Sequence, residues 1–271
     1  MINMIELINP INIEKFKKNL LSTEPFPHFC IDNFLNEDFA EEVYQSFPSF
    51  QEAKQLGKEF SAVNEKKKVQ ITDSSKFPPA IKKLNDLLAS NEFVDMWADI
   101  TGIPNLLADA ELAGGGIHET NTGGHLDVHV DFNYMEEKQY HRRLNILIYF
   151  NKDWKEEYGG YLDVWDKDVK QRYGYFEPKF NRACGFITSE ISFHGVTPIT
   201  CPEGVTRKSF ATYYYTKEAP TGWTGEKHST IFKARPDEWA KGNILMPLEK
   251  TSRGLQSGIK GFKQVLKRIV K

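Results

Sequence analysis

Apolar side chains in the first hundred residues recur three or four positions apart, which is the spacing of a helix face. Residues 39–47 follow this spacing directly after Asn36, a favoured N-cap residue that is itself followed by two acidic residues. Residues 81–88 and 93–100 carry two further apolar stripes of the same kind. We therefore predict helices after Asn36 and over both stripes, with their apolar faces packed against the rest of the protein.

From about residue 105 onwards, apolar and polar residues alternate, which is the pattern of β-strands. The clearest case is residues 125–132, where each polar residue is followed by an apolar one. Such a strand buries one face and carries four hydrophilic side chains on the other, toward water or toward a polar cavity inside a barrel. Further strands are predicted at 28–32, 144–150, 161–165, 184–188, 192–196 and 209–216. Many short strands joined by turns that contain Gly and Pro predict a mainly β (α+β) protein, a sandwich or a jelly roll.

The segments that flank the predicted strands differ from them in composition. Residues 51–76 are charged and show little periodicity, which predicts a solvated loop or a lid over a substrate. Residues 259–270 place apolar side chains on one helical face, which indicates a basic amphipathic helix. Such a helix packs on its own domain or binds an anionic membrane surface or a partner. We divide the chain into a helical support region (1–104), a β core (105–218) and a C-terminal extension (219–271).

Composition and charge exclude several classes of function. The chain has 271 residues, which is within the size of a single all-β domain. Its 37 acidic and 35 basic residues give a net charge of −2, which argues against nucleic-acid binding. Cys30, Cys184 and Cys201 are scattered and form no CxxC pair, so we expect free thiols in a reducing cytosol. Neither a signal-peptide pattern nor an apolar stretch of membrane-spanning length is found, so we expect a cytoplasmic protein.

The polar face of the strand at 125–132 offers two overlapping His-x-Asp pairs, His125 with Asp127 and His129 with Asp131. A further histidine, His194, lies on a strand predicted later in the chain. Two histidines and one carboxylate occupy one face of an octahedral iron(II) and leave three positions open for other ligands. The residues alone leave both pairs open as the source of the first histidine and the carboxylate.

A second polar pair, Arg207 and Ser209, lies two positions apart on a predicted strand, so both side chains point the same way. An arginine is always charged and binds a carboxylate through two hydrogen bonds, which Lys208 does less well. These residues indicate a pocket for a carboxylate group. Tyr149 and Asn145 are four positions apart on another predicted strand and share a face as well.

Taken in order along the chain, these motifs resemble the iron(II)- and 2-oxoglutarate-dependent oxygenases, specifically the prolyl 4-hydroxylase-like branch. The resemblance covers roughly residues 110–218. It rests on His129-Val-Asp131, Trp154, Gly159-Gly-Tyr-Leu162, Glu177-Pro-Lys-Phe-Asn-Arg182, His194-Gly-Val196 and Arg207-Lys-Ser209. It implies a double-stranded β-helix (jelly roll) as the core, with supporting N-terminal helices.

The resemblance also assigns the iron ligands and the residues that bind the cosubstrate 2-oxoglutarate. It implies that the iron(II) ligands are His129, Asp131 and His194. It implies that the far carboxylate of 2-oxoglutarate is bound by Arg207, Ser209 and Tyr149, with Asn145 on the same strand face as Tyr149. The third reactant of the family is O₂.

Enzymes of this family convert 2-oxoglutarate to succinate while they hydroxylate an aliphatic C–H of a substrate. The related halogenases leave vacant the position that Asp131 fills, so the resemblance implies a hydroxylase. It favours a prolyl or similar substrate, peptidyl or derived from an amino acid, with a sugar or another small metabolite as the alternative. His125 and Asp127 would then be neighbours of the site, and His118 and His141 are expected in loops.

Two other classes of protein remain open at this point. A cupin-like metal enzyme that does not use 2-oxoglutarate would make Arg207 and Ser209 incidental residues at a strand edge. A non-catalytic jelly-roll module that binds a carbohydrate would use the polar strand face as a groove. Release of succinate from 2-oxoglutarate in the presence of iron would separate the oxygenase from both.

Overall fold

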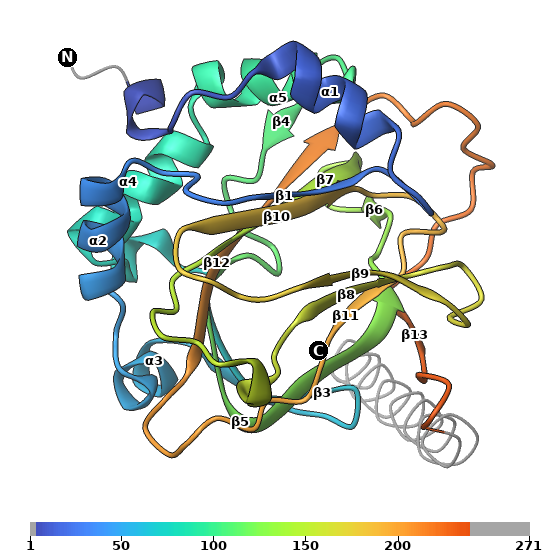
Figure 1. Cartoon of the computed structure of the whole chain (residues 1–271). Helices are drawn as coiled ribbons and strands as arrows, with labels where there is room; N and C mark the ends of the chain where they lie inside the picture. Colours follow the sequence, from blue (N-terminus) through green and yellow to red (C-terminus); the bar gives the residue numbers. More distant parts are fainter. Residues whose placement is uncertain (1–3, 239–271) are drawn as a thin grey trace, which may run out of the picture.

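The computed structural model describes residues 4–238 and contains a large antiparallel sheet with helices on its outside (Figure 1). The helices are η1 (Met4–Leu7), α1 (Ile13–Leu21), α2 (Glu37–Gln45), α3 (Phe50–Leu56), η2 (Ser74–Lys76), α4 (Pro79–Leu88), α5 (Asn91–Thr101) and η3 (Glu156–Tyr158). The strands are β1 (His28–Ile31), β2 (Lys58–Ser61), β3 (Glu65–Ile71), β4 (Leu107–Ala108), β5 (Gly116–Val130), β6 (Tyr134–Met135), β7 (Tyr140–Tyr149), β8 (Leu162–Trp165), β9 (Arg172–Phe176), β10 (Arg182–Ile187), β11 (His194–Val196), β12 (Arg207–Thr216) and β13 (Ile231–Lys233). The mainly β prediction is confirmed.

The central strands follow the order β1-β10-β7-β12-β5-β11-β8-β9. The sheet folds over on itself, so that the β1-β10-β7-β12 part and the β5-β11-β8-β9 part enclose a cavity in a nearly closed jelly roll (Figure 1). The double-stranded β-helix that the family resemblance implied is therefore confirmed.

Strand β7 shows how alternation separates the core from the cavity. Leu144, Ile146 and Ile148 belong to the main hydrophobic cluster that the sheet forms with the helices, and they are fully buried. Asn145 and Leu147 point the opposite way, into the cavity. Because side chains on a strand alternate between its faces, β7 packs against the helices with one face and lines the cavity with the other.

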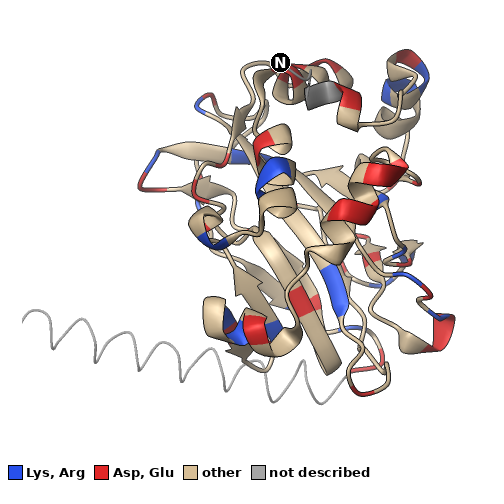
Figure 2. Ribbon diagram, turned by 90° about the vertical axis from the view of Figure 1, so that its left-hand side faces the viewer, with Lys and Arg blue, Asp and Glu red and all other residues tan. Residues whose placement is uncertain are grey.

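The predicted helices form where the apolar stripes lie. Asn36 caps α2 because its side chain accepts a hydrogen bond from the Phe39 backbone N–H at 2.9 Å. Trp97 of α5 is wholly buried and stacks on Phe29 of β1 with 4.8 Å between ring centroids. The helices therefore brace the outer face of the sheet. Acidic and basic residues are interspersed over the helices and loops, in keeping with the small net charge (Figure 2).

Residues 51–76 differ from the predicted loop or lid. They contain most of α3, the β2-β3 hairpin and η2, and β3 pairs with β5 from Glu65↔Leu126 to Ile71↔Ile117. Three consecutive lysines at 66–68 interrupt the alternation of apolar and polar residues that would have predicted β3. Val69 and Ile71 of this strand are nevertheless buried. Pairing with a long neighbouring strand decided the structure where the local sequence was uninformative.

Strands also enter the sheet from both flanking regions. β1 pairs with β10, and β13, from the predicted C-terminal extension, pairs with β5. The domain boundaries at residues 104 and 218 remain a prediction. The predicted amphipathic helix at 259–270 lies outside the described residues. Within residues 4–238, no helix combines the length and the apolar character needed to cross a membrane.

The three cysteines are free thiols, as predicted, but two of them are not scattered in space. Cys30 and Cys184 lie directly opposite each other on β1 and β10, with 3.2 Å between the sulfur atoms. The separation in sequence concealed this pair, because only the β1-β10 register brings the two residues together.

Candidate active site

The cavity at the centre of the jelly roll collects the polar residues that the sequence singled out. It lies between strands of both halves of the sheet, because β5, β7, β8, β11 and β12 all contribute side chains. Its lining consists of Lys68, His118, Thr120, His125, Leu126, His129, Asp131, Arg142, Asn145, Leu147, Leu162, His194, Val196, Arg207 and Tyr213. The cavity therefore combines several histidine and basic side chains with apolar wall residues.

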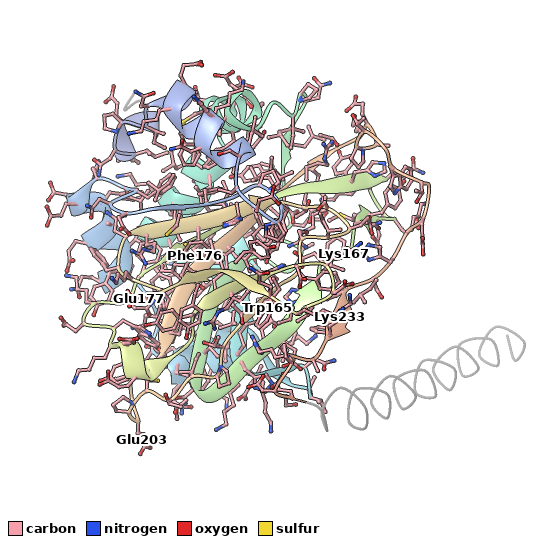
Figure 3. All side chains as sticks on the ribbon, turned by 45° about the vertical axis from the view of Figure 1, so that its right-hand side comes forward. Trp165, Lys167, Phe176, Glu177, Glu203 and Lys233 are labelled. Atoms are coloured by element: carbon pink, nitrogen blue, oxygen red, sulfur yellow. The ribbon has the colours of Figure 1, made fainter. Side chains whose placement is uncertain are left out.

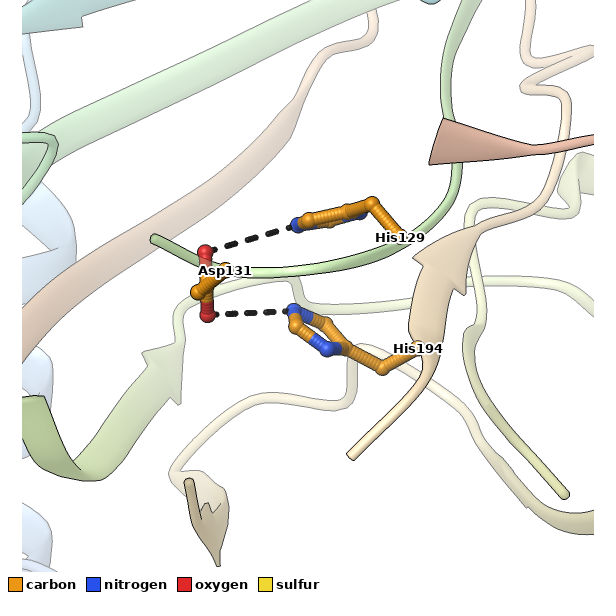
Figure 4. A group of neighbouring side chains, drawn as sticks. All are labelled: His129, Asp131 and His194. Atoms are coloured by element: carbon orange, nitrogen blue, oxygen red, sulfur yellow. Dashed lines mark ion pairs between the residues drawn. The ribbon is translucent and has the colours of Figure 1, made fainter. Parts of the chain in front are cut away.

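His129, Asp131 and His194 meet at one end of this cavity (Figure 4). His129 on β5 lies opposite His194 on β11, and Asp131 follows one residue after the end of β5. The Asp131 carboxylate lies 3.6 Å from His129 Nε2 and 3.7 Å from His194 Nε2. One possible ligand atom from each residue lies within 4.8 Å of the others, so this donor set fits a metal ion that prefers two imidazoles and one carboxylate.

Backbone carbonyl groups orient both histidines. His129 Nδ1 lies 2.8 Å from the Asp127 carbonyl oxygen, and His194 Nδ1 lies 2.9 Å from that of Ser192. Because a carbonyl oxygen only accepts, Nδ1 donates in both cases and the lone pair is left on Nε2. Burial next to His129 lowers the pKa of His194 to about 3, which keeps this imidazole neutral and able to bind a metal.

Asp131 is held by two neighbours on β7. Asn145 Nδ2 donates to its Oδ2 at 2.7 Å, and Arg142 Nη2 lies 3.3 Å from the same oxygen. Burial alone would raise the pKa of Asp131, but the charge of Arg142, together with the neighbouring imidazoles, outweighs burial and holds this pKa well below its usual range. Asp131 is therefore an ionised carboxylate in a fixed orientation, as a metal donor requires.

At the other end of the cavity Arg207 is part of the lining, whereas Tyr149 and Ser209 are buried next to it and are not part of the lining. Ser209 on β12 lies directly opposite Tyr149 on β7, and the Arg207 guanidinium lies 4.9 Å from the centre of the Tyr149 ring. Arg207 Nε donates to the Gly160 carbonyl oxygen at 2.7 Å. A Cβ on Gly160, whose φ is +70°, would come within 3.0 Å of Arg207 Cδ, so this position favours glycine.

Three buried polar atoms at this end lack a hydrogen-bond partner among the described residues. They are Arg207 Nη2, Tyr149 Oη and Ser209 Oγ, and all three residues are at most 3% exposed. Buried polar groups without partners are rare in folded proteins, because each one costs about 1–3 kcal/mol. A cation and two hydroxyl groups together fit the far carboxylate of 2-oxoglutarate.

The structure separates residues that the strand pattern had placed on one face. Asp127 does not line the cavity with His125, His129 and Asp131, and its wholly buried carboxylate lies 3.9 Å from Arg235 Nη1. The register between β5 and β11 shifts here, and this irregularity breaks the strict alternation.

Two further expectations about residues near the site were wrong or incomplete. His118 and His141 lie in β5 and β7, not in loops, and His118 lines the cavity. Arg142 was not singled out as a partner of Asp131, although its buried guanidinium lies against the Tyr213 ring at 3.7 Å. Arg142 and Asn145 are three positions apart, so strand alternation does not place them on one face. The sequence therefore contained no indication that Arg142 contacts Asp131.

Comparisons with known proteins identify the domain that carries this site. The profile of the 2OG-Fe(II) oxygenase superfamily matches residues 115–215. A prolyl hydroxylase from Trichoplax adhaerens, solved in complex with a peptide fragment of the hypoxia inducible factor oxygen degradation domain, is 18% identical with a TM-score of 0.55. That alignment covers 79% of this chain and 96% of the Trichoplax chain. No curated protein matches the sequence.

Two further solved structures share the fold. A prolyl-4-hydroxylase from Pseudomonas putida is 14% identical with a TM-score of 0.52, over 74% of this chain and 98% of its own. The 2-oxoglutarate-dependent carbocyclase SnoK of nogalamycin biosynthesis is 12% identical with a TM-score of 0.52, over 77% of this chain and 87% of its own. Residues 115–215 thus match the 2OG-Fe(II) oxygenase superfamily, which supports an iron(II)- and 2-oxoglutarate-dependent dioxygenase, and the fold of the chain is like that of the prolyl hydroxylases.

Proposed function

We propose that this dioxygenase hydroxylates an aliphatic C–H of a prolyl or similar substrate, peptidyl or derived from an amino acid. In this proposal His129, Asp131 and His194 bind iron(II), and Arg207, Ser209 and Tyr149 bind the far carboxylate of 2-oxoglutarate. The observation that carries the proposal is that the three metal donors and Arg207 line one cavity, with the unpartnered hydroxyl groups of Tyr149 and Ser209 buried next to Arg207.

When bound, iron(II) and 2-oxoglutarate would activate O₂, with one oxygen atom entering the substrate, the other entering succinate, and the lost carbon leaving as CO₂. The residues of this chain orient the reactants and exclude water. The histidines present Nε2, because Nδ1 of each donates to a carbonyl oxygen. Asn145 and Arg142 hold one oxygen of Asp131 from β7, so we assign Asn145 to positioning this ligand rather than to contact with 2-oxoglutarate.

Asp131 favours hydroxylation over halogenation. A halogenase needs the carboxylate's coordination position for its halide, and here an ionised side chain fills it with fixed geometry. We therefore expect the product to carry a hydroxyl group.

A path that leads away from the metal donors favours an extended substrate. A second hollow shares Asp131 and Arg142 with the cavity and continues past Phe132. A groove that also contacts Phe132 then runs along β6, past Tyr134 and Met135. A path of this length suits a peptide segment better than a compact metabolite. We also propose a cytoplasmic location, which rests on the free thiols and on the sequence.

The test is a screen of peptides and small metabolites for a gain of one oxygen that depends on iron(II) and 2-oxoglutarate. We expect one succinate per hydroxylated product, and a prolyl peptide among the substrates. With ¹⁸O₂, the new hydroxyl should carry the label. A product without label from O₂, or a chlorinated product in the presence of chloride, would contradict the hydroxylase. A sugar or another small metabolite as the only substrate class would contradict the prolyl part alone.

A further inference from the structure

A buried ion pair lies behind the metal donors, and its arginine comes from outside the family-matched residues 115–215. Arg235 forks onto Asp163, with Nε at 3.0 Å from Oδ2 and Nη2 at 3.2 Å from Oδ1. Its Nη1 lies 3.9 Å from Oδ1 of Asp127. Both aspartates are wholly buried, and Arg235 is 9% exposed. One arginine therefore faces two carboxylates that burial would otherwise make very costly.

The two aspartates belong to the strands that present the two histidines. Asp127 precedes His129 by two residues on β5, and its carbonyl oxygen accepts the hydrogen bond from His129 Nδ1. Asp163 on β8 lies opposite Gly195, the residue directly after His194. Arg235 thus connects the segment that orients the first histidine with the segment beside the second.

Gly195 shows that the chain leaves room for this ion pair. A Cβ at this position would come within 2.9 Å of both Arg235 Nη2 and Asp163 Oδ1. A larger residue directly after His194 would therefore push the pair apart. The absence of a side chain at 195 is explained by Arg235, which lies forty residues later in the sequence.

The segment that carries Arg235 also packs on His129 itself. β13 pairs with the end of β5, with Phe232 opposite His129. The two rings lie 5.4 Å apart at an angle of 37°. Lys233 donates to the Lys167 carbonyl oxygen, which holds β13 against the turn after β8, where Figure 3 labels both lysines. β13 and Arg235 thus form a strap across the back of the metal donors.

We propose that Arg235 is a positioning residue for the iron centre, which it sets by fixing Asp127 and Asp163 and, through them, the separation of His129 and His194. The inference rests on the iron ligands proposed above. Loss of the forked contact leaves the buried Asp163 carboxylate without two hydrogen bonds and removes the guanidinium group next to Asp127. The segment whose carbonyl group orients His129 then loses one of its contacts. Outer residues of this kind change metal affinity by about 10–100-fold when they are altered.

The test measures Fe(II) affinity without O₂ and the visible spectrum of the Co(II)-loaded protein in Arg235→Gln and Arg235→Lys. We expect at least a roughly tenfold loss of affinity in Arg235→Gln. Arg235→Lys keeps the charge but not the fork, so it should fold and show a smaller loss together with a shifted Co(II) spectrum. Arg182→Gln is the matched control, because Arg182 also forks onto an aspartate, Asp32, and joins segments away from the metal donors.

The outcomes separate this inference from the proposed function. Suppose that the unaltered protein binds Fe(II) and that Asp131→Ala does not. If Arg235→Lys then retains the original Fe(II) affinity and Co(II) spectrum, the positioning role of Arg235 is wrong, but the iron site is still supported. If the unaltered protein binds no Fe(II), the proposed function fails. If Arg182→Gln lost Fe(II) affinity as strongly as Arg235→Gln, the loss would reflect a general loss of protein stability, and the inference would be overturned. Should Arg235→Gln not fold, Arg235→Lys alone decides.

Discussion

The two ends of the cavity differ in how far the protein satisfies its own polar groups. At the metal end, Asp131 already has Asn145 and Arg142 as partners, and both histidines donate to carbonyl oxygens. At the carboxylate end, Arg207 Nη2, Tyr149 Oη and Ser209 Oγ are buried without partners among the described residues. The proposed metal ligands are therefore preorganised by the protein, whereas the other end would be completed by the proposed carboxylate ligand.

This difference predicts opposite effects of substitutions at the two ends. Removing a partnered group at the metal end should damage both the site and the stability of the ligand-free protein. Removing an unpartnered group at the carboxylate end should weaken ligand binding and leave the ligand-free protein equally stable or more stable.

The largest effect is expected for Asp131→Ala. Loss of the carboxylate removes an iron ligand and leaves the buried Arg142 without its anion, so Fe(II) binding and succinate formation should fall below detection and the melting temperature should fall. Circular dichroism should still show the folded sheet. His125→Ala serves as the comparison: it should retain the metal. If His125→Ala lost the metal and His129→Ala kept it, the other His-x-Asp pair would be the ligand pair.

Arg207→Ala should weaken 2-oxoglutarate binding and leave Fe(II) affinity unchanged. The loss of a buried charged partner typically costs about 2–5 kcal/mol. Anaerobic calorimetry, first with Fe(II) and then with 2-oxoglutarate, checks both affinities. An equal fall in the affinities for Fe(II) and 2-oxoglutarate would show that the two ends of the cavity do not act separately. An unchanged affinity for 2-oxoglutarate would favour a cupin-like enzyme.

Glu119 is a buried carboxyl group outside the cavity lining, and within residues 4–238 only one of its oxygens has a partner: Thr206 Oγ1 donates to its Oε2 at 3.0 Å. Its Oε1 lacks a partner among the described residues, and burial raises the pKa of Glu119 to about 7 from 4.5. A raised carboxyl pKa means that the folded state holds the proton more tightly than the unfolded state. The contribution of Glu119 to the free energy of unfolding is therefore fully present below pH 4.5 and is lost as pH rises toward 7.

Glu119→Gln should remove this pH dependence. Relative to the unaltered protein, the variant should gain up to about 3 kcal/mol of unfolding free energy at pH 8 and little at pH 4.5. Urea unfolding at both pH values measures the difference. The same gain at both pH values would show that Glu119 does not titrate in this range.

Tyr149→Phe should show the smallest effect, and the direction of the effect should differ between the ligand-free and the ligand-bound protein. The hydroxyl has no partner in the ligand-free protein, so its removal should leave the melting temperature unchanged or raise it slightly. The affinity for 2-oxoglutarate should fall by a factor equivalent to about 1 kcal/mol, since one neutral hydrogen bond is lost. Ser209→Ala should behave in the same way. A lower melting temperature without ligand would mean that these hydroxyl groups have partners within the protein.

The sequence predicted those parts of the molecule that depend on local alternation and on residue type. The helices after Asn36 and over the two apolar stripes formed, and His129, Asp131 and His194 met in space as the family resemblance implied. The β2-β3 hairpin was missed, because three lysines cover its periodicity and pairing with β5 creates the strand.

Contacts between distant segments were also beyond prediction. Arg142 reaches Asp131 through the β7 register, and Arg235 reaches Asp163 only after β13 pairs with β5. A shift of register in β5 turned Asp127 away from the cavity, against strict alternation. Each of these depends on the position of one strand relative to another, which a single sequence does not contain.

The division of the cavity into a metal end and a carboxylate end is tested most directly by comparing 2-oxoglutarate with 2-oxobutyrate, which lacks the far carboxylate. Both affinities are measured without O₂ on the Fe(II)-loaded protein and on Arg207→Ala. The unaltered protein should prefer 2-oxoglutarate by at least about 30-fold, the lower bound set by a buried charged contact. Arg207→Ala should bind both compounds about equally well. A preference that persists undiminished in Arg207→Ala would contradict the assignment of this end of the cavity to the carboxylate.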